Sequence, residues 1–451
     1  MSLPKAIEYV IRKIMNHGGQ AYLVGGALRD HLLGRPIVDY DIAVSLLPDE
    51  ITALFSDHRS WPTGKRFGTV TIEVDKMNIE ITTFRQETLY SDSRHPDKVS
   101  FVTDINLDLS RRDFTINAMA WNPFQTSNFI DPFKGKEDLN QRIIRTVGSP
   151  YERFAEDPLR IMRGIRFSAQ LNFQINEETK KAMTLCSKEL HKVSAERIRD
   201  ELNKILLSPH PDKGLLELQE TGTLSILVTP KGETKENTLT LLNGQNTQHI
   251  NHLEMQLPLR LAAFMSLLYK YEIGFNAPRS ASFLNDSLRS LRYDNKTIAH
   301  VIKLMQAYES FHSTEVSPYI IRKLTGQVGM DDIRSILSWA DIANKYDVQC
   351  DTRYDNVSLS LNKDDQEAKL KEAILILSRI QQNNDPVFFE QLDIKGDDVL
   401  SIGIGNKNPR LVGEALSLAY DWILQNPECN HKEYMLDKLK KHYCRLLFTG
   451  M

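Results

Sequence analysis

The spacing of apolar residues divides the chain into two regions of different character. In the first 140 residues, short apolar runs and alternating segments are interspersed with helical patterns, which is typical of strands connected by helices. The segments GTVTIEV and NIEITTF alternate on either side of Lys76 and Met77, which predicts a hairpin. Helices are predicted at about 3–17 and 27–34, and strands at 21–26, 40–45, 68–74, 78–84 and 119–123.

After about residue 142 the strand pattern largely disappears, and helical spacing dominates. We therefore predict an α+β fold, in which an N-terminal α/β head with a mixed or antiparallel sheet and helices is followed by an all-α remainder. One later helix, SAERIRDELNKILLSP at 194–209, carries acidic and basic residues at helical spacing. We interpret this helix as a structural, salt-bridged element.

Composition and charge exclude several classes of protein. The 56 basic and 59 acidic residues give a net charge of −3, so a nucleic-acid partner would need a local basic patch. The four cysteines lack Cys-x-x-Cys spacing, which indicates a reduced, cytosolic protein. The N-terminal segment lacks the apolar run of a signal peptide, and no stretch of 18 apolar residues could cross a membrane. We expect a soluble, cytoplasmic protein without a membrane partner.

The candidate chemistry begins at Gly25 and Gly26, where a predicted strand passes into a helix. Backbone without side chains can approach a phosphate there, and the N–H groups of the helix N-terminus can bind it. Arg29 lies one turn later and could hold a phosphate oxygen. A Gly-Gly pair is most often an ordinary turn, so a phosphate-binding role for this pair depends on the residues around it.

Three carboxylates follow. Asp39 and Asp41 stand at the start of the next predicted strand, and because strand side chains alternate, both are expected on one face. Two like charges held so close favour a cation beside them, and Mg²⁺ takes one or two carboxylates together with substrate phosphates. Glu80, on the face opposite Ile79 and Ile81, could complete a two-metal cluster. Taken singly, each of these carboxylates would be a solvated strand residue.

The segment EDPLRIMRGIRF places acidic and basic residues three apart at Asp157, Arg160, Arg163 and Arg166, which predicts four side chains on overlapping sides of one helix. Three arginines stacked in this way repel one another unless they meet a polyanion. Cytosine and adenine both present an amine donor beside a ring-nitrogen acceptor, whereas guanine and uracil present a carbonyl there. Asp157 accepting from the amine and Arg160 donating to the ring nitrogen would therefore select C and A.

The order of these motifs, with RRDFTINAMA at 111–120 and DPFKGKEDL at 131–139, resembles the class II tRNA nucleotidyltransferase and bacterial poly(A) polymerase family, most densely over about residues 20–205. The resemblance implies that Gly26 and Arg29 contact the nucleoside triphosphate. It also implies that Asp39 and Asp41 are the catalytic metal ligands and that Glu80 is the third catalytic carboxylate.

The RRDFTINA segment supplies further candidates through the same resemblance. Arg112 is expected to contact the nucleotide, and Asp113 and Asn117 to support the placement of sugar and phosphate, with Phe114 and Ile116 anchoring a strand behind them. The full set of predicted nucleotide-binding residues is Gly25, Gly26, Arg29, Arg112, Asp113, Asn117, Asp157, Arg160, Arg163 and Arg166.

The activity that the resemblance implies is template-independent addition of C, C and A to the 3′ end of tRNA. CTP and ATP would be the substrates, Mg²⁺ the cofactor and pyrophosphate the product of a two-metal nucleotidyl transfer. DNA is not expected as a partner, and the oligomeric state stays open. Four domains are predicted: a catalytic head at 1–142, a helical neck for nucleotide selection at 143–207, a helical body at 208–365 and a tRNA-binding helical tail at 366–451.

Alternatives remain open at this point. The chain could be an A-adding or CC-adding relative, or a bacterial poly(A) polymerase, although the Gly-x-x-x-Gly-Thr-Val pattern at 64–70 resembles CCA-adding enzymes. The presence of all three carboxylates disfavours a non-catalytic RNA-binding protein. Residues 85–102 resemble the mobile loop of complete CCA-adding enzymes, in which Asp92 and Arg94 could pair with the arginine helix and reposition it for A. The alternative is an ordinary surface loop.

Overall fold

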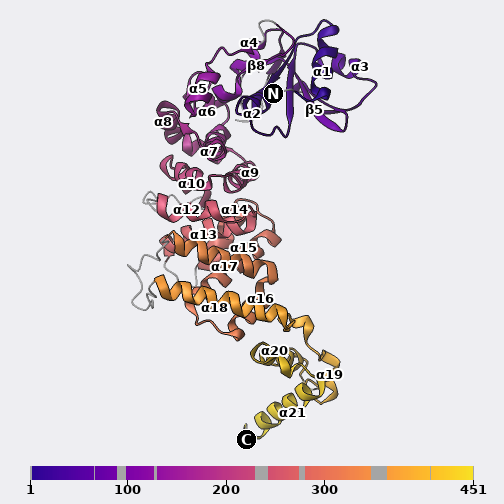
Figure 1. Cartoon of the computed structure of the whole chain (residues 1–451), viewed down its shortest axis with the longest axis vertical. Coiled ribbons are helices and arrows are strands. Elements are labelled where there is room, and N and C mark those ends of the chain that lie inside the picture. Colours follow the sequence, from indigo (N-terminus) through magenta and orange to yellow (C-terminus); the bar gives the residue numbers. More distant parts are fainter. Residues whose placement is uncertain are drawn as a thin grey trace. The chain divides into compact units, whose positions relative to one another are not determined.

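The computed structural model describes residues 3–64, 67–88, 98–125, 129–228, 242–273, 280–346, 363–406 and 408–449 (Figure 1). The predicted loop residues Asp92 and Arg94 lie outside these ranges. The chain forms two compact units, one of residues 1–242 with 290–292 and the other of residues 243–289 with 293–451. The four-domain division remains a prediction.

A mixed sheet forms the centre of the head in the first unit, as predicted. In the part of the chain that the structure describes, it has seven strands in the order β3-β4-β5-β2-β1-β8-β9. β2 and β5 are parallel, and the other neighbours are antiparallel. The strands are β1 (Ala21–Val24), β2 (Tyr40–Val44), β3 (Arg59–Gly64), β4 (Thr69–Val74), β5 (Met77–Thr83), β8 (Ala120–Trp121) and β9 (Phe129–Ile130).

The predicted hairpin is present as β4 and β5, but its turn lies one residue earlier than expected. Val74 pairs with Met77, so Asp75 and Lys76 form the turn. Both turn residues have positive φ, 51° and 64°, as the tight turns that match strand twist require. The prediction of Lys76 and Met77 was therefore wrong by one residue, because Met77 already belongs to β5.

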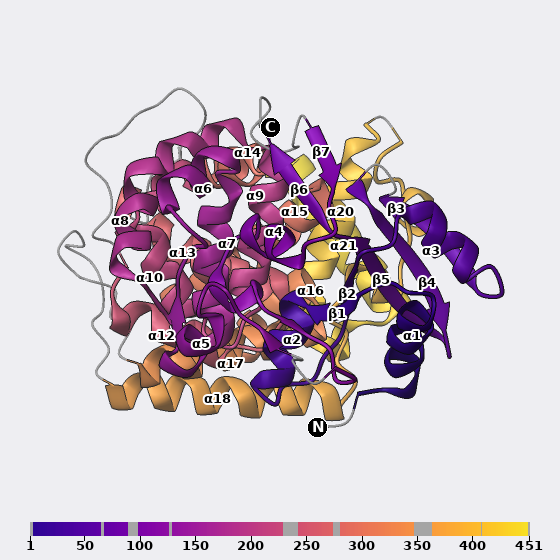
Figure 2. The same ribbon diagram turned by 90° about the horizontal axis from the view of Figure 1, so that it is seen from above.

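One face of the sheet packs on helices and the other is partly open. Helix α1 (Lys5–Asn16) has apolar residues at Ile7, Val10, Ile11 and Ile14, a helical spacing that places all four in the core. Together with α3 (Pro48–Leu54), it contacts the strands on the side of Ile72 and Ile79. Figure 2 shows the strands of the head from a second direction.

The RRDFTINA segment itself forms no strand. Thr115–Asn117 form a short 3₁₀ helix, and Phe114 makes a single bridge to Thr146. Phe114 and Ile116 are nevertheless fully buried, so they anchor the segment as expected. Two small sheets are separate from the main one, formed by β6 (Arg85–Thr88) with β7 (Lys98–Phe101) and by β10 (Ile143–Ile144) with β11 (Gln174–Ile175).

Helices make up the remainder of the first unit. The helix at Leu159–Leu171 packs closely on Phe114 of the head and on Met183 of the helix at Glu177–Cys186, since a side chain at Gly164 would meet both. The helices not yet named are α2 (Gly25–Leu32), α4 (Ile105–Ser110), α5 (Gly135–Gln141), α6 (Pro150–Glu156), α7 (Leu159–Leu171), α8 (Glu177–Cys186), α9 (Ala195–Leu206), α10 (Pro211–Glu220) and α11 (Thr223–Val228), with a 3₁₀ helix at Ser187–Lys192.

The second unit is helical wherever the structure assigns regular elements to it. It contains α12 (Gly244–His252), α13 (Leu257–Ile273), α14 (Ser280–Ser290), α15 (Asn295–Ser313), α16 (Pro318–Val328), α17 (Met330–Lys345), α18 (Lys363–Gln382), α19 (Gly396–Ser401), α20 (Arg410–Gln425) and α21 (Lys432–Thr449), with 3₁₀ turns at Phe389–Gln391 and Pro427–Cys429. Among the described residues, no helix combines the length and apolarity needed to cross a bilayer. The predicted α+β fold is confirmed.

Candidate active site

Two of the three predicted carboxylates lie side by side on the open face of the sheet. Asp41 on β2 pairs in register with Glu80 on the parallel strand β5, so their side chains project from the same face. Asp39 precedes β2 and is exposed, so strand alternation does not determine its direction as we had expected. The charge of Asp39 still contributes to raising the pKa of Asp41.

The environment of Asp41 disfavours the charged form of its carboxyl group. Burial raises the pKa of this carboxyl to about 6, and the charges of Glu80 and Asp39 act in the same direction. Arg112 and Arg29 act against the rise. Among the described residues, no three His, Cys, Asp or Glu side chains are grouped closely enough to hold a metal ion by themselves. The carboxylates of Asp41 and Glu80 therefore suit a hard cation that takes its remaining ligands from substrate or water.

The turn from β1 into α2 brings backbone next to this carboxylate pair. Gly25 has a φ of +64°, a conformation that favours glycine. A Cβ at Gly25 would lie 3.1 Å from a guanidinium nitrogen of Arg112 and 3.2 Å from an Asp41 carboxylate oxygen. The absence of a side chain at Gly25 therefore leaves the start of α2 open beside Asp41 and Arg112.

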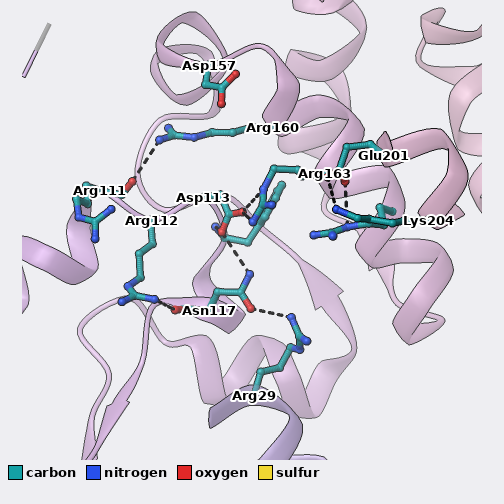
Figure 3. Close-up of polar contacts among 12 residues, drawn as sticks. Arg29, Arg111, Arg112, Asp113, Asn117, Asp157, Arg160, Arg163, Glu201 and Lys204 are labelled. Atoms are coloured by element: carbon teal, nitrogen blue, oxygen red, sulfur yellow. Dashed lines mark hydrogen bonds and ion pairs between the residues drawn. The ribbon is translucent and has the colours of Figure 1, made fainter. Parts of the chain in front are cut away.

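A chain of hydrogen bonds joins two of the predicted arginines through the RRDFTINA segment (Figure 3). Arg29 donates to the Asn117 side-chain oxygen at 2.9 Å, and the Asn117 amide donates to Asp113 at 3.3 Å. The other oxygen of Asp113 accepts two hydrogen bonds from Arg163, at 2.8 and 2.6 Å. The segment thus positions one guanidinium from α2 and one from α7.

Asp113 remains ionised despite its burial. Burial by itself raises the pKa of this carboxyl, but the charge of Arg163 and the hydrogen bonds from Arg163 and Asn117 outweigh that effect. The pKa is held well below its usual range. Asp113 consequently acts as a permanent anion that keeps Arg163 in place.

The other arginines of α7 also have carboxylate partners within the chain. Arg160 forms an ion pair with Glu156 and donates to the Arg111 carbonyl at 3.3 Å, whereas Nε of Arg166 lies 3.1 Å from Glu201 on α9. Burial lowers the pKa of Arg166 to about 10. The expectation that these arginines repel one another without a polyanion was wrong, because carboxylates of the chain itself, such as Glu156 and Glu201, supply the compensating charges.

Asp157 lies at a different place from the one predicted. It is not part of helix α7 but follows the end of α6, with an extended backbone at φ −144°. One carboxylate oxygen accepts from the Leu159 N–H at 3.1 Å, and the other accepts from Arg197 on α9 at 2.9 Å. Pro158 starts the helix after it, so Asp157 and Arg160 do not project from one helix face.

These residues surround one cavity of about 850 Å³, large enough for a nucleoside triphosphate. All ten predicted nucleotide-binding residues line it, together with Asp41 and Glu80, whereas Asp39 does not. The structure therefore brings together residues that lie as far apart in the sequence as Gly25 and Arg166.

Comparison with known proteins shows what this chain is similar to. Residues 21–145 match the model of the poly A polymerase head domain, and residues 172–233 match that of a probable RNA and SrmB-binding site of polymerase A. Two curated relatives are CCA-adding enzymes. That of Anoxybacillus flavithermus is 45% identical over 245 residues, which cover 54% of this chain and 60% of the relative. That of Streptococcus gordonii is 48% identical over 223 residues, which cover 49% and 55%.

A solved structure agrees over a longer stretch. The crystal structure of the Bacillus stearothermophilus CCA-adding enzyme in complex with CTP superimposes with a TM-score of 0.73 and 27% identity, and the match covers 100% of each chain. Residues 21–145 are therefore a poly A polymerase head domain, and the chain as a whole is similar in structure to a CCA-adding enzyme. The sequence matches nevertheless span little more than half the length of the curated relatives.

The site also contains residues that the sequence did not reveal. Asp108 on α4 is 1% exposed and forms ion pairs with Arg111 at 2.8 Å and Arg112 at 3.0 Å. Burial raises the pKa of Asp108, but the two guanidinium groups outweigh this and lower it. The signal was available, because Asp108 precedes the arginines by three and four residues, the spacing of a helical ion pair.

Glu156 and Glu201 also belong to the missed residues, and each balances one arginine of α7. Glu201 is 4% exposed, on the helix that we had interpreted as structural. That interpretation agrees with its contacts, since Arg197 and Glu201 both bond to groups at or near α7.

Proposed function

We propose that this chain adds C, C and A to the 3′ end of tRNA, using CTP and ATP and releasing pyrophosphate. The observation that carries the proposal is the single cavity in which a carboxylate pair faces a set of positioned arginines. The relatives named above, which are CCA-adding enzymes, support the choice of reaction. Because the tRNA would carry no template for the added bases, the protein itself would select them.

The residues of the chain would divide the work between the two sides of the cavity. The backbone of Gly25 and Gly26 and the guanidinium groups of Arg29 and Arg112 would bind the triphosphate and offset the charge that develops on the leaving pyrophosphate. The bonds from Asn117 and Asp108 hold these two arginines before substrate arrives. Positioning would therefore supply much of the rate enhancement.

The carboxylates on the opposite side fit a magnesium site. Asp41 and Glu80 offer hard oxygen donors on one face, and Asp39 adds negative charge beside them. Mg²⁺ bound there would polarise the reacting phosphate and favour the ionised form of the attacking 3′-hydroxyl.

Base selection is proposed for Asp157 and Arg160, which both line the cavity. The carboxylate would accept from the exocyclic amine of C or A, and the guanidinium would donate to the ring nitrogen. Arg197 positions the carboxylate through its 2.9 Å bond. We propose that the segment that carries Asp92 and Arg94 repositions this pair for adenine, the larger base.

The experiment supplies tRNA that lacks its CCA end with CTP, with ATP or with both. We expect two C residues to be added from CTP alone. We expect a terminal A to be added only when CTP and ATP are both present. Repeated A addition to any RNA would identify a poly(A) polymerase, and C addition without A, or the reverse, a partial-activity relative.

In a second experiment, a two-glycine turn replaces residues 89–97, between β6 and β7. Loss of A addition with retained C addition supports the loop role, whereas retained A addition excludes it.

A further inference from the structure

A row of side chains crosses the sheet from the carboxylates to its edge. Asp41 pairs with Glu80, Glu80 pairs with Thr71, and Thr71 pairs with Trp61 on β3. Residues that pair directly across neighbouring strands project from the same face of a sheet. Trp61 therefore lies on the same face as Asp41 and Glu80, three strands away from Asp41. With strands about 4.8 Å apart, this separates the backbones of Asp41 and Trp61 by about 14 Å.

This face is the one that the sheet leaves open near the site. The alternate residues on β4 and β5, such as Ile72 and Ile79, are fully buried on the opposite side. Trp61 is 41% exposed, and β3 is the edge strand of the sheet among the described residues. The cavity reaches toward it, since Gly64 at the end of β3 and Thr69 on β4 belong to the lining. A large aromatic surface is thus exposed beside the active-site cavity.

The strand order places Trp61 and the triphosphate-binding groups on opposite sides of the carboxylates. Gly25 and Gly26 follow β1, whereas Trp61 lies on β3, and β2 and β5 with their carboxylates lie between. In an in-line displacement, the attacking oxygen approaches from the side opposite the leaving pyrophosphate. An RNA whose 3′-hydroxyl attacks a triphosphate held at Gly25 and Gly26 must therefore approach from the side of β3.

We propose that Trp61 stacks on the last unpaired base of the RNA acceptor and so positions its 3′-hydroxyl. The proposal rests on the proposed function, which supplies the RNA 3′ end as substrate. Aromatic side chains bind single-stranded nucleic acid in this way without reading sequence, because every base has a π face. Such a contact suits an enzyme whose acceptor ends in a different base after each addition.

The test uses the full chain and a tRNA that lacks its CCA end and carries 2-aminopurine as its last base. Stacking on an aromatic ring quenches the fluorescence of 2-aminopurine. Without nucleotide, quenching is expected with the wild type and with Trp61→Phe, and is expected to be lost with Trp61→Leu, which keeps an apolar side chain but has no π face. In steady-state assays on unlabelled tRNA, Trp61→Leu is expected to raise the KM for tRNA about tenfold. The KM for CTP is expected to stay within twofold.

Tyr9→Ala is the matched control, because Tyr9 is an exposed aromatic residue on α1, which packs on the other face of the sheet. Its KM for tRNA is expected to stay within twofold of the wild type. Equal quenching by the wild type and Trp61→Leu, or an unchanged KM for tRNA, would overturn the role of Trp61. A wild-type chain that adds no nucleotide to tRNA would instead refute the proposed function, and the quenching assay would then show separately whether Trp61 contacts RNA.

Discussion

Two charged regions face the same cavity, and the chain neutralises only one of them. Hydrogen bonds or ion pairs with acidic or amide side chains, such as that of Asp113, engage Arg29, Arg160, Arg163 and Arg166. In the described part of the chain, no hydrogen bond or ion pair engages the carboxylates of Asp41 and Glu80. The comparison shows that contacts within the chain arrange the arginine side in advance, and we propose that the carboxylate side needs a cation that binds from outside.

This difference has a physical basis. Guanidinium groups that are hydrogen-bonded to buried acids lose little further conformational freedom when a triphosphate binds. The free energy of binding is therefore not reduced by the need to order them. Asp41 and Glu80, by contrast, repel each other, and this repulsion adds to the burial that raises the pKa of Asp41. A divalent cation would relieve the repulsion, so metal and substrate binding are expected to support each other.

The largest expected effect comes from the carboxylate side. Asp41→Asn keeps the shape of the side chain but removes the charge, so incorporation of both CTP and ATP is expected to fall about a thousandfold or more, while tRNA binding is retained. Asp39→Asn is expected to lose activity to a similar degree. Primer-extension rates and filter binding of tRNA measure the two properties.

Glu73→Gln serves as its control, because Glu73 lies two residues from Thr71 on the same strand and pairs with Asn78. Its activity is expected to stay within about twofold. Near-normal turnover by Asp41→Asn would contradict the division of the cavity into two regions.

The next effect concerns base choice on the arginine side. Asp157→Ala is expected to raise incorporation of UTP and GTP relative to CTP by roughly ten- to a hundredfold, since a good hydrogen-bonding pair contributes ~1–3 kcal/mol of discrimination. Competition assays with mixed nucleotides measure this ratio. Arg197→Gln separates direct selection from positioning, because it removes the partner of Asp157 but keeps the carboxylate. An unchanged preference in Asp157→Ala would place selection at another residue.

A smaller effect is expected on stability. Asp113→Asn removes the anion that holds Arg163, and a hydrogen bond to a charged group contributes about 1.5–3 kcal/mol. We expect a loss of about 1–3 kcal/mol in the free energy of unfolding of the first unit, measured by denaturant titration. Asp200→Asn is the control, since its pair with Arg199 is exposed and such pairs contribute little. Equal stability of both variants would show that the network is not pre-arranged.

The smallest effect is a pH dependence. Because the pKa of Asp113 is lower in the folded state than in the unfolded chain, its contribution to stability is complete above about pH 4 and is lost as the pH falls further. The wild type is therefore expected to lose more stability than Asp113→Asn on acidification below pH 4. Parallel pH profiles of the two proteins would contradict this assignment.

Much of the head could be predicted because its signals are local. The alternation in β4 and β5 and the helical spacing in α1 follow directly from which side chains must be buried. The boundary errors also have local causes, as at Asp75 and Lys76, where backbone conformation rather than polarity defined the turn. Strand β3, with Pro62 and Gly64 in its sequence, gave no strand pattern, and its pairing with β4 defines it.

The residue types and order of the motifs were enough to indicate a nucleotidyltransferase-like head, the carboxylate pair and the arginines near it. The sequence could not show which groups balance one another, because ion pairs such as Arg163 with Asp113 join residues 50 positions apart. The sequence pattern placed Asp157 on the arginine helix. In the structure the backbone is extended at Asp157, between α6 and α7, and the side chain contacts Arg197. Tertiary structure decided these points, since charge compensation depends on distance in space, and spacing along one helix or strand reports only neighbours within that element.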